Sequence, residues 1–296
     1  MEELPAVNMR WRIVMRWRIA LFVTALIGVI RMGGRLFGAE AEPIVPDRPI
    51  QLFNGTNLSG FYTWLVDTKR TDPRGVFSVT NQVIRISGDG LGYLATKQTY
   101  RDFHLLLEFK WGTTNWTWGN RVGAARDSGV FLHAIGPDGS SHDGGGAFKP
   151  AIECQVMQGS VGDFLLIRGD AGDGRTVAPR LTCETSAERD TDGWSWWQRG
   201  GQRRTIERWG RVNWSRKDRS WRDVTNFRGD HDVESAQGEW TKVECRCEGR
   251  KIEVKVNGVV VNEAFEVFPD HGQILLQCEG SEAFFRRLDL RPLRLR

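Results

Sequence analysis

The sequence predicts an all-β fold, a β-sandwich of jelly-roll type made of two antiparallel sheets. Two observations carry this prediction. Short apolar stretches with a period of two, separated by Gly, Asn and Asp, recur along the chain, and no long amphipathic helix lies among them. With 296 residues, 40% of them hydrophobic, the chain also has enough apolar material to fill the space between two such sheets.

The first half of the chain supplies a hairpin and three longer strands. Residues 77–79 and 83–86 flank Thr80-Asn81-Gln82 and predict the hairpin. The longer strands are expected at residues 103–111, 128–133 and Ala151–Met157.

The last third of the chain has the clearest pattern. It predicts four strands, at residues 241–247, Lys251–Val256, 272–277 and 283–290. Asn257-Gly258 separates two apolar runs, and this dipeptide favours a two-residue hairpin turn in which both central residues have positive φ. Together the predicted strands place one β domain at residues 42–296.

Residues 1–41 are expected to be a secretory signal peptide. An arginine-rich stretch at 10–18 leads into the apolar run 19–30 and then to Ala39-Glu40-Ala41. The apolar run is shorter than the ~20 residues of a membrane helix. An uncleaved N-terminal anchor is the alternative, and in either case the body of the protein is expected to be secreted or periplasmic.

Charge and cysteine content exclude two classes of site. Residues 1–41 hold six of the arginines against three glutamates, so the rest of the chain is close to neutral and lacks the concentrated basic face of a nucleic-acid-binding protein. The five cysteines lack the spacing of a zinc site. We expect them to be buried packing residues with at most one disulfide.

A tryptophan-rich stretch at residues 184–239 does not follow the strand pattern. It is rich in charge and glycine, and its six tryptophans argue against disorder. We expect an ordered insertion over one end or face of the sandwich. Its tryptophans, Trp194 among them, could stack on sugar rings or could anchor the insertion by burial.

Several polar residues are candidates for a site. Alternation places His133 on one strand face with Gly129 and Phe131, and places Glu153 and Gln155 together on one face of the next predicted strand. A glycine-rich loop at 142–150 brings Lys149 to the start of that strand. These side chains either line a cleft or lie on a solvated outer face.

A further carboxylate, Glu279, follows a strand near the C-terminus and could face the same cleft as Glu153. Paired carboxylates suit acid and base chemistry on a sugar.

The order of these motifs resembles the 3-keto-disaccharide hydrolase family. The resemblance runs from about residue 49 to 292 and rests on Leu52-Phe53-Asn54-Gly55-Thr56-Asn57-Leu58-Ser59-Gly60, Tyr100-Arg101-Asp102-Phe103, Asp127-Ser128-Gly129-Val130, Ile152-Glu153-Cys154-Gln155, Val256-Asn257-Gly258 and the segment from Glu279-Gly280 to Arg291-Pro292. It implies a concanavalin-like sandwich that cleaves glycosides oxidised at C3, by removal of the C2 proton, β-elimination and hydration.

The resemblance also implies roles for individual residues. His133 and Glu153 would hold a divalent cation or the enolate, and Glu279 would transfer protons. The sugar would be held by Asp127, Gln155, Lys149 and Trp194. Two other functions stay open: a non-catalytic, lectin-like carbohydrate-binding module of the cell surface, and a structural or interaction protein of the cell surface.

Overall fold

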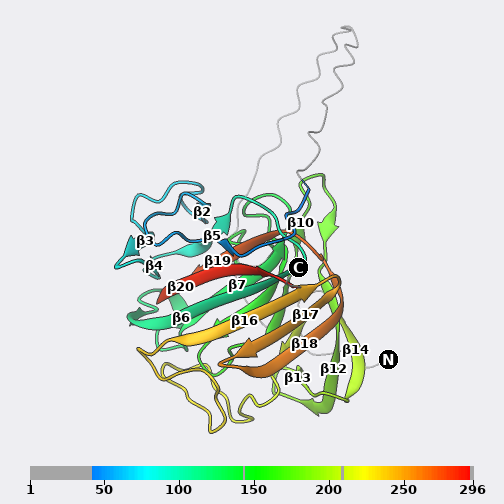
Figure 1. The fold of residues 1–296 in the computed structure, drawn as a ribbon. Helices are drawn as coiled ribbons and strands as arrows, with labels where there is room; N and C mark the ends of the chain where they lie inside the picture. The colour runs from blue at the N-terminus through cyan, green and yellow to red at the C-terminus, as the bar shows by residue number, and fades with distance from the viewer. Residues whose placement is uncertain (1–41, 143, 208–209, 294–296) are drawn as a thin grey trace, which may run out of the picture. The chain divides into compact units, whose positions relative to one another are not determined.

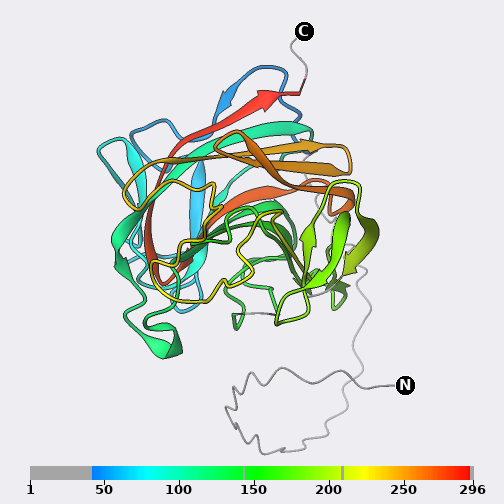
Figure 2. The ribbon, with the colours of Figure 1, turned by 90° about the horizontal axis from the view of Figure 1, so that it is seen from below.

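The computed structural model describes residues 42–142, 144–207 and 210–293, and these residues form an all-β fold with a single 3-10 turn, η1 (Gly119–Arg121). The all-β prediction is confirmed. Most strands lie in two facing layers (Figures 1 and 2).

The first layer carries the candidate site. In order of pairing, its strands are β2 (Phe61–Leu65), β5 (Leu91–Thr96), β19 (Gln273–Glu279), β7 (Asp127–Ala134), β8 (Ala151–Met157), β9 (Phe164–Ile167), β15 (Arg211–Asn213) and β13 (Ser195–Trp197).

The second layer is built around the long strand β6. In order of pairing, its strands are β3 (Phe77–Thr80), β4 (Val83–Ile86), β20 (Ser281–Pro292), β6 (Phe103–Asn115), β16 (Thr241–Glu248), β17 (Lys251–Val256), β18 (Val259–Phe268), β12 (Arg180–Arg189) and β14 (Gln202–Glu207), with β1 (Ile50–Gln51) paired to β20. The short strands β10 (Gly169–Asp170) and β11 (Thr176–Val177) pair with each other.

The prediction of two separate antiparallel sheets is not confirmed. β12 pairs with β18 in the second layer and with β13, which continues into the first, so hydrogen bonding runs through one 18-stranded sheet. The pair β13–β15 is parallel. The link is made by residues of the tryptophan-rich stretch, whose strands the alternation pattern did not predict.

The main core fills the space between the layers. Val130 of β7 and Ile152 of β8 belong to the same buried cluster as Leu105 and Phe109 of β6. Burying each such side chain contributes roughly 1.5–3 kcal/mol relative to leaving it exposed. This burial determines which face of β7 and β8 points away from the core, and the candidate site lies on that other face.

The predicted hairpin around Thr80-Asn81-Gln82 and the predicted Asn257-Gly258 turn are both present, and each turn has two residues. Asn81 and Gln82 connect β3 to β4 with φ of 48° and 61°, and Asn257 and Gly258 connect β17 to β18 with φ of 48° and 83°. Positive φ at both central positions matches the right-handed twist of the flanking strands, which explains the Asn-Gly dipeptide.

The five cysteines are buried and free, so the prediction of packing residues is confirmed and the optional disulfide is not formed. Cys245 and Cys247 of β16 both belong to the main core cluster, as their spacing of two predicts.

Residues 184–239 are ordered where the structure describes them, and they contain β13, β14 and β15. Trp196, Trp197 and Trp214 are buried there. Three tryptophans of this stretch thus act as hydrophobic anchors.

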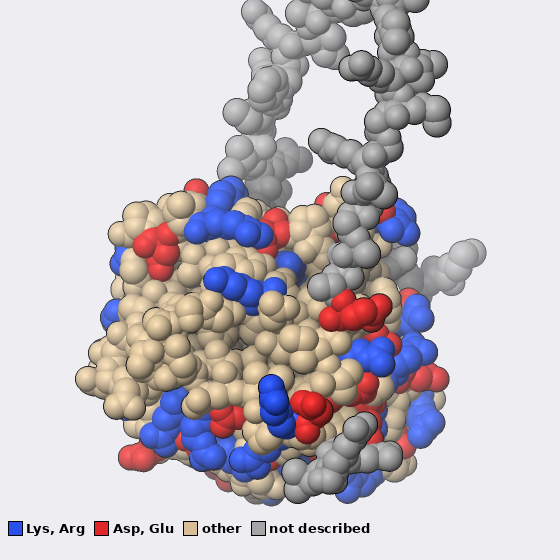
Figure 3. Space-filling model, turned by 45° about the horizontal axis from the view of Figure 1, so that its top comes forward, with Lys and Arg blue, Asp and Glu red and all other residues tan. Residues whose placement is uncertain are grey.

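The predicted signal peptide lies outside the described residues. Within the described ranges, no helix is both long and apolar enough to cross a membrane. On the face shown in Figure 3, Lys and Arg are interspersed with Asp and Glu around an uncharged area, so this face carries no concentrated basic patch.

Candidate active site

Polar side chains of β7, β8 and β19 gather on the face turned away from the main core. Ile152 and Cys154 of β8 point into that core, so Glu153, which lies between them, points to the opposite face. Asp127 of β7 lies directly opposite Glu279 of β19 in the strand register. Three carboxyl groups from three adjacent strands therefore share one face, as predicted for Glu153 and Glu279.

Gly129 is the residue that lets two of these side chains approach the sheet. A Cβ atom at this position would lie 2.2 Å from Glu153 Oε1 and 2.9 Å from Gln277 Oε1. No real Cβ atom tolerates the first distance, so any larger residue would displace the carboxyl of Glu153. A glycine in the centre of a strand here marks close approach of side chains rather than flexibility.

Glu153 is almost completely buried. Its side chain is 2% exposed, and Oε1 has no hydrogen-bond partner among the described residues. Burial raises the pKa of Glu153 well above its usual range, and the nearby charges of Asp127 and Glu279 raise it further. Both effects favour the protonated form of Glu153, which can act as a proton donor.

Asp127 has a similar environment. Burial raises the pKa of its carboxyl group, and the negative charge of Glu279 raises it further. The guanidinium of Arg121, whose Nη2 lies 3.4 Å from Oδ2, lowers the pKa and so opposes both effects. Oδ1 is buried without a hydrogen-bond partner in the described part of the chain. The backbone amide of Asp127 donates to Ser281 Oγ at 2.9 Å, which fixes the start of β7.

Glu279 differs from the other two carboxyl groups because it is partly exposed. Its Oε2 accepts a hydrogen bond of 2.6 Å from Gln277 Nε2, which fixes the orientation of both side chains. The site thus combines two buried acids, whose raised pKa favours the protonated form, with one partly exposed carboxyl group. This is the division of roles that general acid–base catalysis requires.

Arg211 of β15 supplies positive charge to this face, and sequence reasoning missed it. Its charge lowers the pKa of both Glu153 and Asp127 against the effect of burial. Its guanidinium donates to Asp163 Oδ2 at 2.8 and 2.6 Å, and Lys217 donates to the same oxygen at 2.9 Å. Arg211 lies in the tryptophan-rich stretch without a motif, so only the pairing of β15 with β9 brings it to the site.

The prediction that His133 shares a face with Glu153 is wrong. Phe131 pairs with Leu275 and Ala134 with Gln273, so Leu132 and His133 together oppose the single residue Ile274. This β-bulge turns the side chain of His133 toward the core, and its φ of 56° marks the irregularity.

The environment of His133 is that of a core residue. The ring is 0% exposed and packs edge-to-face on Phe103 at 5.7 Å between centroids, while Nδ1 donates to the carbonyl of Pro269 at 3.0 Å. Burial lowers the pKa of His133 to about 4, so the ring is neutral. We therefore assign it no catalytic role.

The predicted metal pair does not fit a divalent cation. His133 and Glu153 lie on opposite faces of the sheet, so no single ion can bind both. Within the described ranges, no group of three or more His, Cys, Asp or Glu side chains is placed to hold a metal.

Lys149 is buried at another part of the same face. Its Nζ donates to Gln273 Oε1 at 2.6 Å, six residues along β19 from Glu279, or ~20 Å at strand spacing. Nearby, Asp138 accepts hydrogen bonds of 2.7 and 2.8 Å from the hydroxyl groups of Tyr62 and Tyr93. Lys149 thus belongs to a polar network that is separate from the acid cluster formed by Asp127, Glu153 and Glu279. Its contact with the sugar stays a prediction.

The glycine-rich loop covers the sheet between these two groups. Phe148 packs edge-to-face on Phe131 at 5.3 Å between ring centroids and belongs to a second apolar cluster with Leu275. The loop therefore closes part of the face instead of delivering Lys149 to Glu153.

The other two predicted sugar-binding residues have different surroundings. Gln155 lies next to the acid cluster, 4% exposed, and its Oε1 accepts the amide hydrogen of Val156 at 2.9 Å. Trp194 is half-buried in the turn before β13, where its amide donates to Asp190 at 2.8 Å. Gln155 is placed to support the site, and a role for Trp194 remains a prediction.

The family to which the chain belongs follows from a comparison with protein-family models. The model of the 3-keto-alpha-glucoside-1,2-lyase-like domain matches residues 48–291. The chain belongs to this family. Asp127, Glu153, Arg211 and Glu279 all lie within the matched part of this 3-keto-α-glucoside-1,2-lyase-like domain.

Solved structures similar to this domain include three kinds of protein. A protein from Parabacteroides distasonis described as a candidate glycosyl hydrolase is 16% identical, with 84% of this chain and 95% of that chain covered and a TM-score of 0.46. The carbohydrate-binding module CBM66 from Bacillus subtilis is 12% identical, with 79% of this chain and 97% of that chain covered and a TM-score of 0.42. The β-glucanase from Bacillus licheniformis is 12% identical, with 82% of this chain and 97% of that chain covered and a TM-score of 0.39. No curated protein sequence matches the chain.

Proposed function

We propose that the chain is a carbohydrate-active enzyme that cleaves 3-keto-glycosides by β-elimination and hydration. Membership of the 3-keto-α-glucoside-1,2-lyase-like family supports the substrate class. The observation that supports the chemistry is the placement of a buried Glu153, whose raised pKa favours the protonated form, and the more exposed Glu279 on one face of the sheet.

The proposed reaction begins at C2 of the sugar. The ketone at C3 acidifies the C2 proton, and Glu279 removes it. The electron pair of the C2–H bond forms a C1=C2 double bond as the C1–O bond breaks, and the leaving oxygen takes the proton of Glu153. Water then adds across the double bond, with hydroxyl at C1 and a proton at C2, to give the free 3-keto sugar.

The remaining side chains would stabilise and hold the substrate. The positive charge of Arg211 lies near both acids and would favour the negative charge that develops on the C3 oxygen. Gln155 and Asp127 flank the cluster and would bind sugar hydroxyls. In this proposal the protein is exported, with a concanavalin-like jelly-roll fold.

Replacing Glu153 with Gln tests the proposal, because the change keeps the shape of the side chain and removes its proton donor. We expect a loss of about 100-fold or more in kcat on a 3-keto-glucoside, followed as release of free sugar. The matched control is Glu244→Gln on β16 of the second layer, where the mostly buried carboxyl forms ion pairs with His104 and Lys242. The control should keep full activity.

The pH dependence gives a second readout. Wild-type activity should fall as pH rises through the raised pKa of Glu153, because the buried acid then loses the proton that the leaving oxygen needs. Binding of the sugar without any turnover would instead indicate a lectin-like module and would contradict the enzymatic proposal.

A further inference from the structure

The guanidinium group of Arg211 has one edge bound and one nitrogen free. Its Nε and Nη2 atoms donate to Oδ2 of Asp163 at 2.8 and 2.6 Å. The remaining nitrogen, Nη1, forms no hydrogen bond with any residue that the structure describes. It is also not among the buried atoms that lack a partner, so solvent reaches it. The Arg211 side chain is 17% exposed, whereas Asp163 is fully buried, and a ligand can therefore approach Nη1.

Strand pairing places Arg211 in line with Glu153. Leu165 of β9 lies directly opposite Glu153 of β8 on one side and Arg211 of β15 on the other. The three side chains therefore lie on one face of the sheet, with the backbone ends of the row ~10 Å apart at the usual strand spacing. Leu165 is half-buried, so a sugar ring over it would meet Glu153 at one end and Arg211 at the other.

Asp163 is fixed by more than its contact with Arg211. Its Oδ1 accepts the amide hydrogen of Trp214 at 2.7 Å, and its Oδ2 also accepts a hydrogen bond of 2.9 Å from Lys217. Lys217 is 5% exposed and donates as well to Oδ1 of Asn213 at 2.8 Å. Hydrogen bonds between charged groups are short and strong, so these contacts hold the carboxylate of Asp163 in one orientation. The edge of Arg211 that it binds is fixed in turn.

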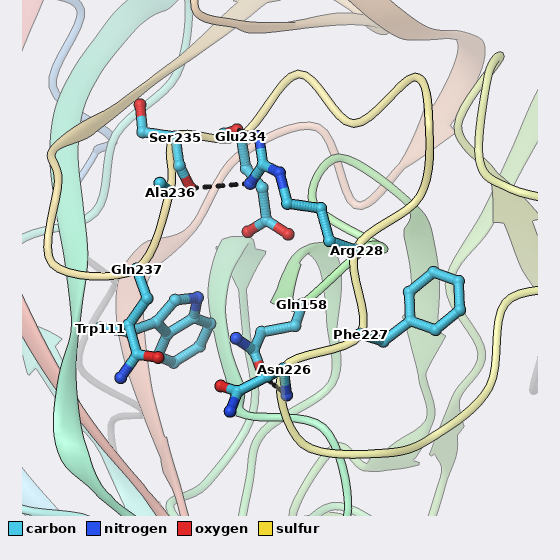
Figure 4. A pocket seen from close by; sticks show the side chains of 9 residues that line it. All are labelled: Trp111, Gln158, Asn226, Phe227, Arg228, Glu234, Ser235, Ala236 and Gln237. Atoms are coloured by element: carbon cyan, nitrogen blue, oxygen red, sulfur yellow. Dashed lines mark hydrogen bonds between the residues drawn. The ribbon is translucent and has the colours of Figure 1, made fainter.

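The turn that carries Asp163 is anchored to the tryptophan-rich stretch. The amide of Gly159 donates to Oε1 of Glu234 at 2.7 Å, and its carbonyl accepts a hydrogen bond of 3.1 Å from the indole of Trp214. Glu234 also lines, with Trp111, the cavity of about 120 Å³ shown in Figure 4, and Asp163 does not. These anchors keep Asp163 in place before any substrate binds.

A guanidinium group held at one edge is a directed donor. Its nitrogens lie in one plane, so fixing Nε and Nη2 also fixes the direction of the Nη1 hydrogens. In the reaction proposed above, removal of the C2 proton moves negative charge onto the C3 oxygen. A donor that is already aimed at such an oxygen stabilises the charge without rearranging in the transition state.

We propose that Asp163 is a positioning residue for this reaction. It holds one edge of Arg211 so that Nη1 donates a hydrogen bond to the C3 oxygen of the sugar while that oxygen becomes negative. Asp163 itself does not touch the substrate, and no proton leaves Arg211. The assignment rests on the proposed function and adds to it the contact that recognises the ketone.

Arg211→Lys tests the free nitrogen, because it keeps a positive charge beside Asp163 and removes the second arm of the fork. We expect kcat on a 3-keto-glucoside to fall about 100-fold while KM changes less than about threefold, since the contact strengthens only in the transition state. The matched control is Arg286→Lys in the second layer, where Nε of the guanidinium donates to Glu108 at 2.6 Å. The control should keep the kcat of the wild type.

The pH profile tests whether Arg211 acts next to Glu153. The charge of Arg211 lowers the pKa of Glu153, so Arg211→Met should raise this pKa and move the alkaline limb of kcat to higher pH. Arg211→Lys keeps the charge and should leave the limb in place.

A double-mutant cycle tests Asp163 itself. Asp163→Asn keeps the shape of the side chain, but its amide group cannot hold the edge of Arg211 as a carboxylate does. We expect its kcat to fall about 10-fold or more. The double variant Asp163→Asn/Arg211→Lys should be no slower than Arg211→Lys, because both changes remove one interaction. If Asp163→Asn does not fold, Lys217→Met is added to every arm of the cycle, since it removes the buried positive charge that pairs with the lost carboxylate.

The kinetics separate the outcomes. A folded Arg211→Lys with the kcat of the wild type, an alkaline limb that does not move in Arg211→Met, or losses that add in the cycle would each overturn the positioning role of Asp163 and leave the proposed function standing. A residue that only supports the fold would lower the urea midpoint of Asp163→Asn without changing kcat. A wild type that releases no sugar would overturn the proposed function and this role with it.

Discussion

At the scale of single residues, burial decides which polar groups of this protein can act as acids. Burial raises the pKa of Glu153 and of Asp127, and Gly129 provides the space in which the carboxyl of Glu153 lies close to the sheet. His133 is the opposite case. It is a residue type that suits catalysis, but one bulge turns it into the core.

The assignment of His133 to the core leads to a testable prediction. Its pKa is lowered to about 4 in the folded protein, while the unfolded chain binds a proton near pH 6.5, so this residue reduces stability as pH falls from 6.5 toward 4. His133→Asn tolerates the positive φ and removes this effect. Between pH 7 and 5 the wild type should lose about 2 kcal/mol relative to the variant in urea unfolding.

Activity provides the control for the same variant. Folded His133→Asn should keep kcat within about twofold of the wild type, a change of no more than ~0.4 kcal/mol in the activation free energy, because the ring lies in the core. A large loss of kcat in a variant that remains folded would return His133 to the site.

At the scale of elements, turns and strand ends place the tryptophan-rich stretch. The turn residue Asn257 does more than allow the hairpin from β17 to β18. Its Nδ2 donates to the carbonyl of Val233 at 2.8 Å and to Ser235 Oγ at 3.1 Å, and its Oδ1 accepts the amide hydrogen of Lys242 at 2.9 Å. One side chain thus ties a local turn to the loop that carries Glu234.

Replacement of Asn257 separates these two contributions. Asn257→Ala should cost about 2 kcal/mol or more in the free energy of unfolding, from the positive φ and the lost hydrogen bonds. Asn257→Gly keeps the backbone conformation and loses only the hydrogen bonds, so it should cost less. Denaturant unfolding of both variants measures the difference, and equal losses would contradict the role of φ.

At the scale of the whole molecule, the two layers are joined by hydrogen bonds as well as by the core. β12 of the second layer pairs with β13 of the first, and the pairing of β15 with β9 brings Arg211 to the acid cluster. All five thiols lie buried within this structure. Stability therefore depends on packing and strand pairing, without help from a disulfide.

The thiols give a prediction for the intact protein. Burial raises the pKa of Cys183 and raises that of Cys278 to about 12, so neither forms a reactive thiolate. We expect no reaction of the native protein with a thiol reagent and five equivalents after denaturation. The melting temperature should not change on addition of dithiothreitol, and a decrease would indicate a disulfide.

Local patterns were sufficient for much of the fold. The period of two in Ala151–Met157 and Lys251–Val256 predicted both strands with their observed ends, and Asn257-Gly258 predicted its turn, because these features depend on neighbouring residues alone. The same alternation correctly separated Glu153 and Gln155 from the core side of β8.

The sequence by itself thus determined the all-β class, the main strands and the face on which Glu153 lies. The tertiary structure alone decided that His133 faces the core, that Arg211 approaches the acid cluster and that Glu234 and Trp111 line the same cavity. The physical reason is the range of the interactions. Alternation and turn formation act between neighbours in the chain, whereas a bulge, a strand pairing and a shared cavity depend on residues that only folding brings together.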